Sequence, residues 1–364
     1  MSGDILPRMA VVRVPFTVEP NYAGWRLDRY LQQKIRRLSR ERIQRLIAGR
    51  LEHEGSGRLK PSTRVVPGMR FALLKEAEPE PEAPLAFGVV HDDGDLVVVD
   101  KPAGLPVHPT ARYAAHTFTA LARERFPGRK VDPAHRLDRE TSGLLACGGS
   151  PEMTRALKAA FARGRVEKAY LAIALGPAPG AAGGGARRGG AGRPATGGPA
   201  ELPPGAAFEV EAPLALTGAS AVRVRMHVHE AGQPARTAFE VLGRRRAPDG
   251  APVLLLACRP RTGRQHQIRA HLHHAGLQLV GDKIYGPDET IFDRFTRGAL
   301  TDGDRERLRL PRHALHAWRL ALPHPRTREP VALEAPWPED LRAFWDGCAP
   351  EGTGARRRRA PPAG

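Results

Sequence analysis

A proline- and glutamate-rich segment at residues 76–84 divides the sequence into two stretches with different hydrophobic periodicity. Its composition is typical of a linker, because prolines stiffen the chain and like charges repel one another. The full length of 364 residues is sufficient for two domains with ample material for a buried core. We therefore expect a small domain over residues 16–75 and a larger one over residues 85–345.

The small domain is expected to contain two short helices and a β-hairpin. Apolar residues between 26 and 49 follow helical spacing with one break. Ser39 lies after this break, where its hydroxyl can accept a free backbone N–H and cap the second helix. Residues 51–74 alternate short β-like pieces with Gly and Pro. The opposite faces of the helices carry Arg36, Arg37, Arg40, Arg42 and Arg45.

The larger domain combines strand-like and helical patterns. Residues 176–206 are nearly all Gly, Ala and Pro, and they have too little apolar surface to offset the entropy of ordering, so we expect a disordered insertion. Residues 350–364 are expected to form a free basic tail. Strand-like patterns occur at residues 89–90, 96–99, 165–175, 221–228, 237–242 and 253–258, and helical patterns at 117–125, 153–161 and 267–275.

The strong positive charge of the chain favours a polyanionic partner. Lys and Arg total 57 against 39 Asp and Glu, which gives a formal net charge of +18. Nucleic acid is the first candidate. An acidic membrane surface is a weaker one, because no apolar run approaches the roughly 20 residues that span a bilayer. Residues 1–10 lack the pattern of a secretory signal, so we expect a cytoplasmic protein.

The sequence lacks the signatures of metal and cofactor sites. Its three cysteines are far apart and form no Cys-x-x-Cys, which argues against a disulfide framework or a thiolate zinc site. It contains no P-loop, dinucleotide glycine signature or His-Glu-x-x-His helix. We therefore expect no metal and no cofactor. The four histidines that can share one helical face have no acidic or cysteine ligand beside them; they are His266, His271, His273 and His274.

Two polar segments of the larger domain indicate a site for carboxylate chemistry. Residues 135–143 read HRLDRETSG, in which Asp138 is flanked by two arginines that keep a carboxylate ionised. The Thr-Ser-Gly that follows is typical of a tight loop. Residues 261–269 read RTGRQHQIR and bring many hydrogen-bond donors together. One carboxylate with a dense set of donors fits a pocket that binds a polyanion and uses the carboxylate chemically.

Several blocks, in the expected order, resemble those of the RluA family of RNA pseudouridine synthases. The resemblance implies an α+β catalytic domain with a mixed, mostly antiparallel central sheet flanked by helices. The N-terminal stretches RLDRYL (26–31) and SRERIQ (39–44) resemble the αL RNA-binding motif named for ribosomal small-subunit protein four. The blocks of the larger domain are DKPAG (100–104), HRLD with TSG (135–143), KAYLA (168–172), TGRQHQIRAH (262–271), GDKIYG (281–286) and LHA (315–317).

The family isomerises uridine to pseudouridine by breaking the bond from uracil to ribose and rejoining the base through a ring carbon. The resemblance gives Asp138 the central role, as nucleophile or as base. It implies that Tyr170 stacks on the flipped uracil and assists proton removal, and that Arg269 pairs with Asp138. Substrate-binding residues are then His135, Arg136, Leu137, Thr141, Arg264, His266 and Gln267, and RNA-binding residues of the small domain are Arg26, Arg29, Arg36, Ser39, Arg40, Arg42 and Arg45.

Each of these roles has a plainer alternative. Asp138 can pair with a flanking arginine on a surface loop, and Tyr170 can be a core tyrosine on a half-buried strand. Arg269 can bind phosphate, in which case Arg264 competes for the catalytic position. Glu140 falls at a position that varies in the family, so no role follows for it.

The expected substrate is structured RNA, with large-subunit ribosomal RNA as the first candidate and transfer RNA left open. We expect the protein to act as a monomer. One rival is a catalytically idle RNA-binding or ribosome-assembly factor with the same fold, which requires a damaged site. Another is a DNA-binding regulator that uses residues 26–49 as a helix-turn-helix, but the sequence shows no recognition helix with base-reading side chains.

Deleting the Gly/Ala/Pro-rich insertion, residues 176–206, is expected to leave enzymatic activity intact, because such a segment contributes nothing to a packed core. The measurement is pseudouridine formation on the native RNA by the deletion variant and the full chain. A large loss of turnover in the deletion variant would contradict this expectation.

Overall fold

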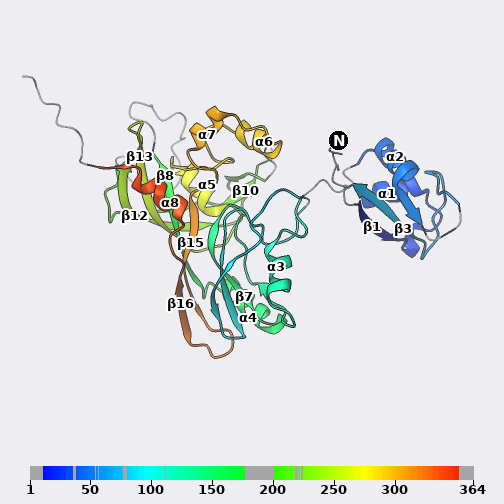
Figure 1. Ribbon diagram of the computed structural model, residues 1–364, viewed down its shortest axis with the longest axis horizontal. Helices are drawn as coiled ribbons and strands as arrows, with labels where there is room; N and C mark the ends of the chain where they lie inside the picture. Colours follow the sequence, from blue (N-terminus) through cyan, green and yellow to red (C-terminus); the bar gives the residue numbers. More distant parts are fainter. Residues whose placement is uncertain are drawn as a thin grey trace, which may run out of the picture. The chain divides into compact units, whose positions relative to one another are not determined.

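The computed structural model describes residues 11–351 except 36–37, 54, 56, 77–79, 111, 177–200, 218–219, 221 and 223. The chain forms two compact units, Met1–Pro81 and Glu82–Gly364, each with its own core (Figure 1). The division falls within the segment at 76–84. Among the described residues, no helix has the length and apolar character needed to cross a membrane.

The first unit packs two helices on a three-stranded antiparallel sheet. Helix α1 (Leu27–Lys34) and helix α2 (Arg40–Arg50) are the two predicted helices. Ser39 caps α2 as predicted, since its hydroxyl accepts the backbone N–H of Arg42 at 3.3 Å. The unit also contains a strand and a short 3-10 helix that the sequence did not suggest. The remaining elements are β1 (Val11–Thr17), η1 (Pro20–Tyr22), β2 (Leu51–His53) and β3 (Arg70–Glu76), with the strand order β1-β3-β2.

Asp28 is a buried carboxylate at the start of α1 and is held by three side chains. Arg26 donates to both of its oxygens at 3.1 and 3.0 Å. Arg40 and Gln44 of α2 donate to Oδ2 at 3.2 and 2.9 Å. These bonds, those of Arg26 above all, hold the pKa of Asp28 well below its usual range against the opposing effect of burial. The cluster therefore joins α1 to α2 beside their apolar contact.

The second unit is built on a large mixed sheet, as predicted. In the described part of the chain twelve strands belong to this sheet, and only β7 and β15 pair in parallel. Its main order is β17-β12-β13-β8-β15-β7-β5-β4, while β6, β9, β14 and β16 each pair with one of these strands. The bounds are β4 (Gly88–Asp92), β5 (Leu96–Lys101), β6 (Asp132–Pro133), β7 (Ser142–Gly148), β8 (Glu167–Leu175), β9 (Ala207–Glu211), β12 (Arg236–Arg246), β13 (Pro252–Pro260), β14 (Gln278–Leu279), β15 (Leu315–Pro323), β16 (Pro330–Glu334) and β17 (Ala349–Pro350).

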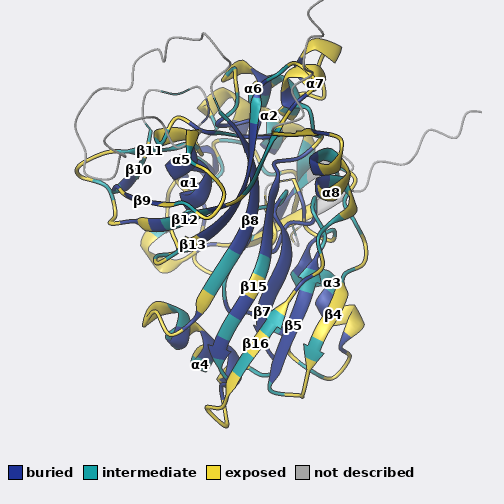
Figure 2. Ribbon diagram, turned by 90° about the vertical axis from the view of Figure 1, so that its left-hand side faces the viewer, coloured by how far each residue is buried: buried dark blue, intermediate teal, exposed yellow. Residues whose placement is uncertain are grey.

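Helices cover both faces of this sheet. Because side chains alternate along a strand, Tyr170 of β8 packs in one apolar cluster with Ile268 of α5, while Leu171 packs in another with Trp345 of α8. Buried residues accordingly run along the central strands (Figure 2). The helices are α3 (Phe118–Arg125), α4 (Pro151–Ala162), α5 (Gln267–His274), α6 (Thr290–Thr296), α7 (Asp302–Leu308) and α8 (Glu339–Asp346), and β10 (Leu214–Leu216) pairs with β11 (Met226–Val228) in a separate small sheet.

The Thr-Ser-Gly segment differs from the tight loop that its composition predicts. The turn ends at Thr141, whose N–H donates to the carbonyl of Asp138 at 3.1 Å, and Ser142 already begins β7. Gly143 is needed for the close passage of β7 past β15, because a Cβ there would lie 2.2 Å from the carbonyl oxygen of Ala317. Its φ of 107° is also one that favours glycine.

The two segments predicted to be disordered lie mostly outside the described residues, and their described ends form specific contacts. Residues 177–200 and 352–364 lie outside the described residues. The carbonyls of Glu201 and Leu202 accept hydrogen bonds from Arg244, and β9 begins soon afterwards. Glu351 forms an ion pair with Arg244 at 2.8 Å next to β17. A deletion of the insertion should therefore stop at residue 200. Residues 221 and 223 of the strand predicted at 221–228 are not described, and β11 covers only its end.

Replacing Asp28 with asparagine is expected to destabilise the first unit by about 1–3 kcal/mol, because charge-assisted hydrogen bonds from two arginines are lost. Hydrogen exchange of the α1 and α2 amides in the full chain measures this directly. Asp302→Asn is the control, since that side chain is 97% exposed. Equal exchange in both variants would mean that the cluster adds nothing to stability.

Candidate active site

A cavity of about 510 Å³ brings together the two polar segments that the sequence analysis singled out. It lies between the loop before β7, the start of β8 and the loop from β13 to α5. All three expected catalytic residues and all seven expected substrate-binding residues line it. These are Asp138, Tyr170 and Arg269, with His135, Arg136, Leu137, Thr141, Arg264, His266 and Gln267.

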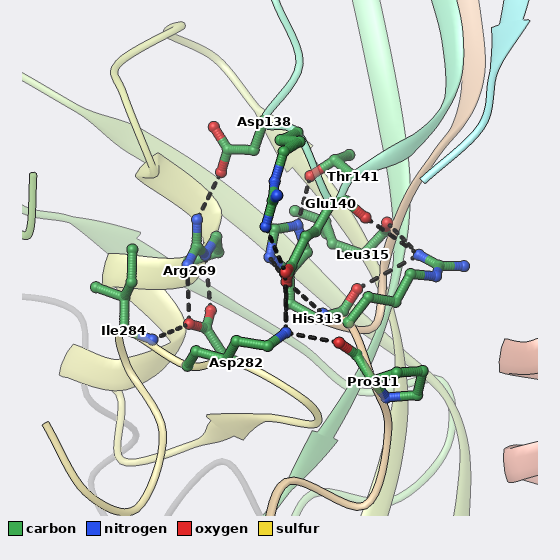
Figure 3. Close-up of polar contacts among 12 residues, drawn as sticks. Asp138, Glu140, Thr141, Arg269, Asp282, Ile284, Pro311, His313 and Leu315 are labelled. Carbon is green, nitrogen blue, oxygen red and sulfur yellow. Dashed lines mark hydrogen bonds and ion pairs between the residues drawn. The ribbon is translucent and has the colours of Figure 1, made fainter. Parts of the chain in front are cut away.

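The expected pair of Asp138 and Arg269 is formed. Nη1 of Arg269 donates to Oδ2 of Asp138 at 2.8 Å (Figure 3). Burial alone would raise the pKa of Asp138, but the Arg269 guanidinium outweighs it and holds the pKa at about 2. The Asp138 side chain is still 20% exposed. The site therefore presents an ionised carboxylate to the cavity at neutral pH.

A second carboxylate, Asp282, fixes the orientation of this arginine. Nε and Nη2 of Arg269 donate to its two oxygens at 2.7 and 2.8 Å, which leaves Nη1 for Asp138. Asp282 is fully buried and also accepts the backbone N–H groups of Ile284 and Tyr285 at 2.9 and 3.0 Å. Asp282 lies in the motif block at residues 281–286, and no role was predicted for it from the sequence. An acidic residue within a motif block was the available signal.

Tyr170 combines a core position with a place in the cavity wall. Its side chain is 9% exposed and belongs to the apolar cluster below α5. Burial, followed by the negative charge of Asp138, raises its pKa well above the usual value. The phenol is therefore protonated at neutral pH and offers a flat apolar surface to a ligand.

His266 is the N-cap of α5 and has a strained conformation next to Asp138. Its φ of 53° is left-handed, a conformation that costs a non-glycine residue about 1–3 kcal/mol. Nδ1 lies 3.2 Å from the Tyr285 hydroxyl and Nε2 lies 3.9 Å from Oδ2 of Asp138. Burial lowers the pKa of His266 to about 4, so the imidazole is neutral at physiological pH.

Three of the expected substrate-binding residues use their polar groups within the protein. Nε2 of His135 accepts the backbone N–H of Ala146 at 3.0 Å. The hydroxyl of Thr141 and Nε2 of His313 share a hydrogen bond of 2.7 Å. The amide oxygen of Gln267 accepts the backbone N–H of Arg264 at 3.0 Å. These contacts shape the loops around the cavity. Leu137 is buried in the apolar cluster, while Arg136 and Arg264 are exposed.

Glu140 has a structural role that the sequence analysis did not assign. Its carboxylate accepts two hydrogen bonds from Nζ of Lys283, at 2.9 and 3.0 Å. Because Lys283 follows Asp282 directly, this pair joins the two segments that supply the carboxylates of the site (Figure 3). Lys101, also buried, donates to the carbonyls of Pro102, Leu105 and Arg139 at 2.8, 2.9 and 3.1 Å.

The expected RNA-binding residues of the first unit differ in their availability. Arg26 and Arg40 bind Asp28, and Arg45 lies 3.7 Å from Glu41. Arg36 lies outside the described residues. Ser39 serves as the cap of α2. Two exposed arginines form no ion pair with a described residue: Arg42, and Arg29, which packs over the Trp25 ring at 5.5 Å.

The histidines near α5 do not gather as metal ligands. Within the described ranges, no three His, Cys, Asp or Glu residues are placed to hold an ion. Nδ1 of His271 lies 2.9 Å from the Thr237 hydroxyl, and its Nε2 lies 3.0 Å from the Ala212 carbonyl. His273 lies 3.2 Å from a guanidinium nitrogen of Arg225. His271 packs within the protein, whereas His273 and His274 are exposed.

Comparison with known proteins agrees with this geometry. Residues 95–274 match the family model described as RNA pseudouridylate synthase. The chain is 32% identical over 341 residues to a protein of Nitrosomonas europaea named ribosomal large subunit pseudouridine synthase D, covering 91% of this chain and 86% of that protein. It is also 32% identical over 346 residues to a protein of the same name from Pseudomonas aeruginosa, covering 93% and 95%.

The fold is also found in a solved structure. Human RNA pseudouridylate synthase domain containing 1 superposes with a TM-score of 0.52 at 24% identity, covering 74% of this chain and 91% of that one. Together with the sequence matches and the motif blocks, this means that the chain is an isomerase that belongs to the RNA pseudouridylate synthase family, of the RluA type.

Proposed function

We propose that this protein converts uridines of large-subunit ribosomal RNA to pseudouridine, with Asp138 as the carboxylate that acts on the ribosyl uracil. The observation that carries the proposal is the ionised Asp138 carboxylate, held by Arg269 at a cavity lined with hydrogen-bond donors. Large-subunit ribosomal RNA is favoured because the relatives from Nitrosomonas and Pseudomonas bear names that state it. Transfer RNA is the alternative substrate.

The chemistry requires a negative group beside the anomeric carbon. As the bond to uracil breaks, positive charge develops on the sugar, and a fixed carboxylate stabilises it. Asp138 either adds to the sugar or removes a ribose proton, and both steps need its ionised form. Arg269 keeps it ionised, and Asp282 prevents Arg269 from turning away. His266, which also lies next to Asp138, is neutral and therefore adds no positive charge that would offset the negative charge of the carboxylate.

Tyr170 is assigned to the uracil ring. Its flat, largely buried ring can stack on a flipped base, which is detached from ribose but retained in the pocket. Because its raised pKa keeps the phenol protonated, Tyr170 assists proton removal from the ring carbon only if it passes its own proton to another base.

The first unit is proposed to bind RNA through its backbone. Of the arginines expected to bind RNA, Arg29 and Arg42 are exposed and form no ion pair with a described residue, which favours them over Arg26 and Arg40 as phosphate contacts. We expect the protein to act as a monomer in the cytoplasm.

Substitution Asp138→Ala is expected to abolish pseudouridine formation, because Asp138 is the one carboxylate that the described residues contribute to the cavity wall. The measurement is pseudouridine mapping of total RNA from a deletion strain complemented with the wild type, with Asp138→Ala or with the exposed control Asp302→Ala. We expect sites in large-subunit RNA to return with the wild type and the control only. If Asp138→Ala also restores them, or if deletion removes no site, the idle binding factor becomes the leading hypothesis.

Replacing Arg269 with lysine is expected to make turnover sensitive to acid. A lysine cannot bind both carboxylates as a guanidinium does, so the pKa of Asp138 rises. The rate should then fall as the pH decreases, since protonation removes the active form. With a pKa of about 2, wild-type Asp138 stays ionised and its rate should show no such decline above about pH 5.

Single-turnover rates between about pH 5 and pH 8 test this prediction. The Lys variant should also be about tenfold slower at the upper end, the loss expected for one charge-assisted hydrogen bond. Parallel profiles for the two proteins would contradict the assigned role of Arg269.

A further inference from the structure

Lys168 is a cation of the active-site cavity that lacks a carboxylate partner. It lies two residues before Tyr170 on β8, and residues two apart on a strand project to the same face. Lys168, Tyr170 and Asp138 all line the cavity. In the part of the chain that the structure describes, its ammonium forms no ion pair, and its recorded contact is with the ring of Phe161, 5.8 Å from the centroid.

The other buried cations of this unit all have strong acceptors. Arg269 binds two carboxylates, Lys283 binds Glu140 and Lys101 binds three carbonyls. Lys168 has none of these, although burial is sufficient to lower its pKa. A half-buried charge without a partner is unfavourable for folding, so its presence indicates a ligand that supplies the opposite charge.

The surroundings of Lys168 indicate which kind of ligand this is. Asp138 is the one carboxylate among the described residues that line the cavity, and Arg269 already binds its Oδ2 at 2.8 Å. Arg136, Arg261 and Arg264 line the same cavity and form no ion pair with any described residue. Gly263 lies beside Nζ of Lys168 in the wall of this cavity of about 510 Å³ and has no side chain to cover the ammonium. An anionic group in the cavity therefore meets several positive charges here.

We propose that Lys168 binds a phosphodiester group of the RNA strand next to the target uridine. This proposal rests on the proposed function, because it takes RNA as the substrate. The nucleotide then spans the cavity, with its sugar at Asp138, its base on Tyr170 and one flanking phosphate on Lys168. Lys168 acts as a substrate-binding residue and leaves the bond-breaking steps to Asp138.

The test combines a protein variant with a change in one RNA phosphate. The protein variants are Lys168→Met, Lys168→Arg and the control Lys130→Met, whose exposed ammonium lies 3.8 Å from Asp132. The probe is a stem-loop containing a uridine that the wild type modifies. Two modified stem-loops are compared with it. In one, a neutral methylphosphonate replaces the linkage on the 5′ side of that uridine, and in the other it replaces the linkage on the 3′ side. In each, the ribose just before the replaced linkage carries a 2′-O-methyl group.

We expect Lys168→Met to bind the unmodified stem-loop about tenfold more weakly than the wild type, as for one charge-assisted contact. Neutralising one of the two linkages should weaken wild-type binding by the same factor. It should leave the affinity of Lys168→Met unchanged, because the two changes remove the same contact. For Lys168→Met, the slope of the logarithm of the binding constant against the logarithm of the salt concentration should be shallower than for the wild type by about 0.7 to 0.9. Lys168→Arg should restore binding, and Lys130→Met should match the wild type.

Other outcomes overturn the proposal in distinguishable ways. If the losses from Lys168→Met and from each methylphosphonate add together, Lys168 contacts another part of the RNA, such as a uracil carbonyl. Unchanged binding by Lys168→Met would exclude a binding role. A lower thermal unfolding temperature of Lys168→Met would indicate a structural role, whereas the missing partner predicts none. If the wild type itself forms no pseudouridine in RNA, the proposed function fails, and this proposal fails with it.

Discussion

The guanidinium of Arg269, held between Asp138 and Asp282, is the interaction on which the site depends. The three residues come from the loop before β7, from α5 and from the segment after β14, so they tie together parts of the chain that are far apart in sequence. Removing one member of such a buried group leaves a charge without its partner, which costs about 3–5 kcal/mol. Catalytic geometry and local stability are therefore coupled here.

The charges around the cavity are opposite in sign to those of a reacting nucleotide. Asp138 lines the cavity and the buried Asp282 shares the Arg269 guanidinium with it, so two carboxylates have one positive charge between them where the sugar becomes positive. The outer part of the cavity presents lysine and arginine groups where a phosphate chain would lie. Burial strengthens the inner effect, because water screens the buried charges less. A low pKa for Asp138 makes it a weak base but guarantees its charge, which favours stabilising the developing sugar cation.

Features set by local sequence could be predicted, and features set by long-range packing could not. Helical spacing and capping chemistry gave α2 and the role of Ser39, and a motif block indicated the pairing of Asp138 with Arg269. The contact of Asp282 with Arg269 and the partner of Glu140 were not predicted. The partner of a carboxylate depends on which segments the fold brings together. Gly143 was interpreted as part of a turn, since composition cannot distinguish a turn from a close strand crossing.

The position of β15 has a consequence for how the chain folds during synthesis. This strand lies between β7 and β8 in the sheet, yet it is made more than a hundred residues after both. Until it emerges from the ribosome, the strands on its two sides have open edges, which are prone to pairing with other chains. The first unit has a local core and can fold early. The nascent chain thus acquires its first unit well before the cavity, whose walls meet only when β15 is inserted.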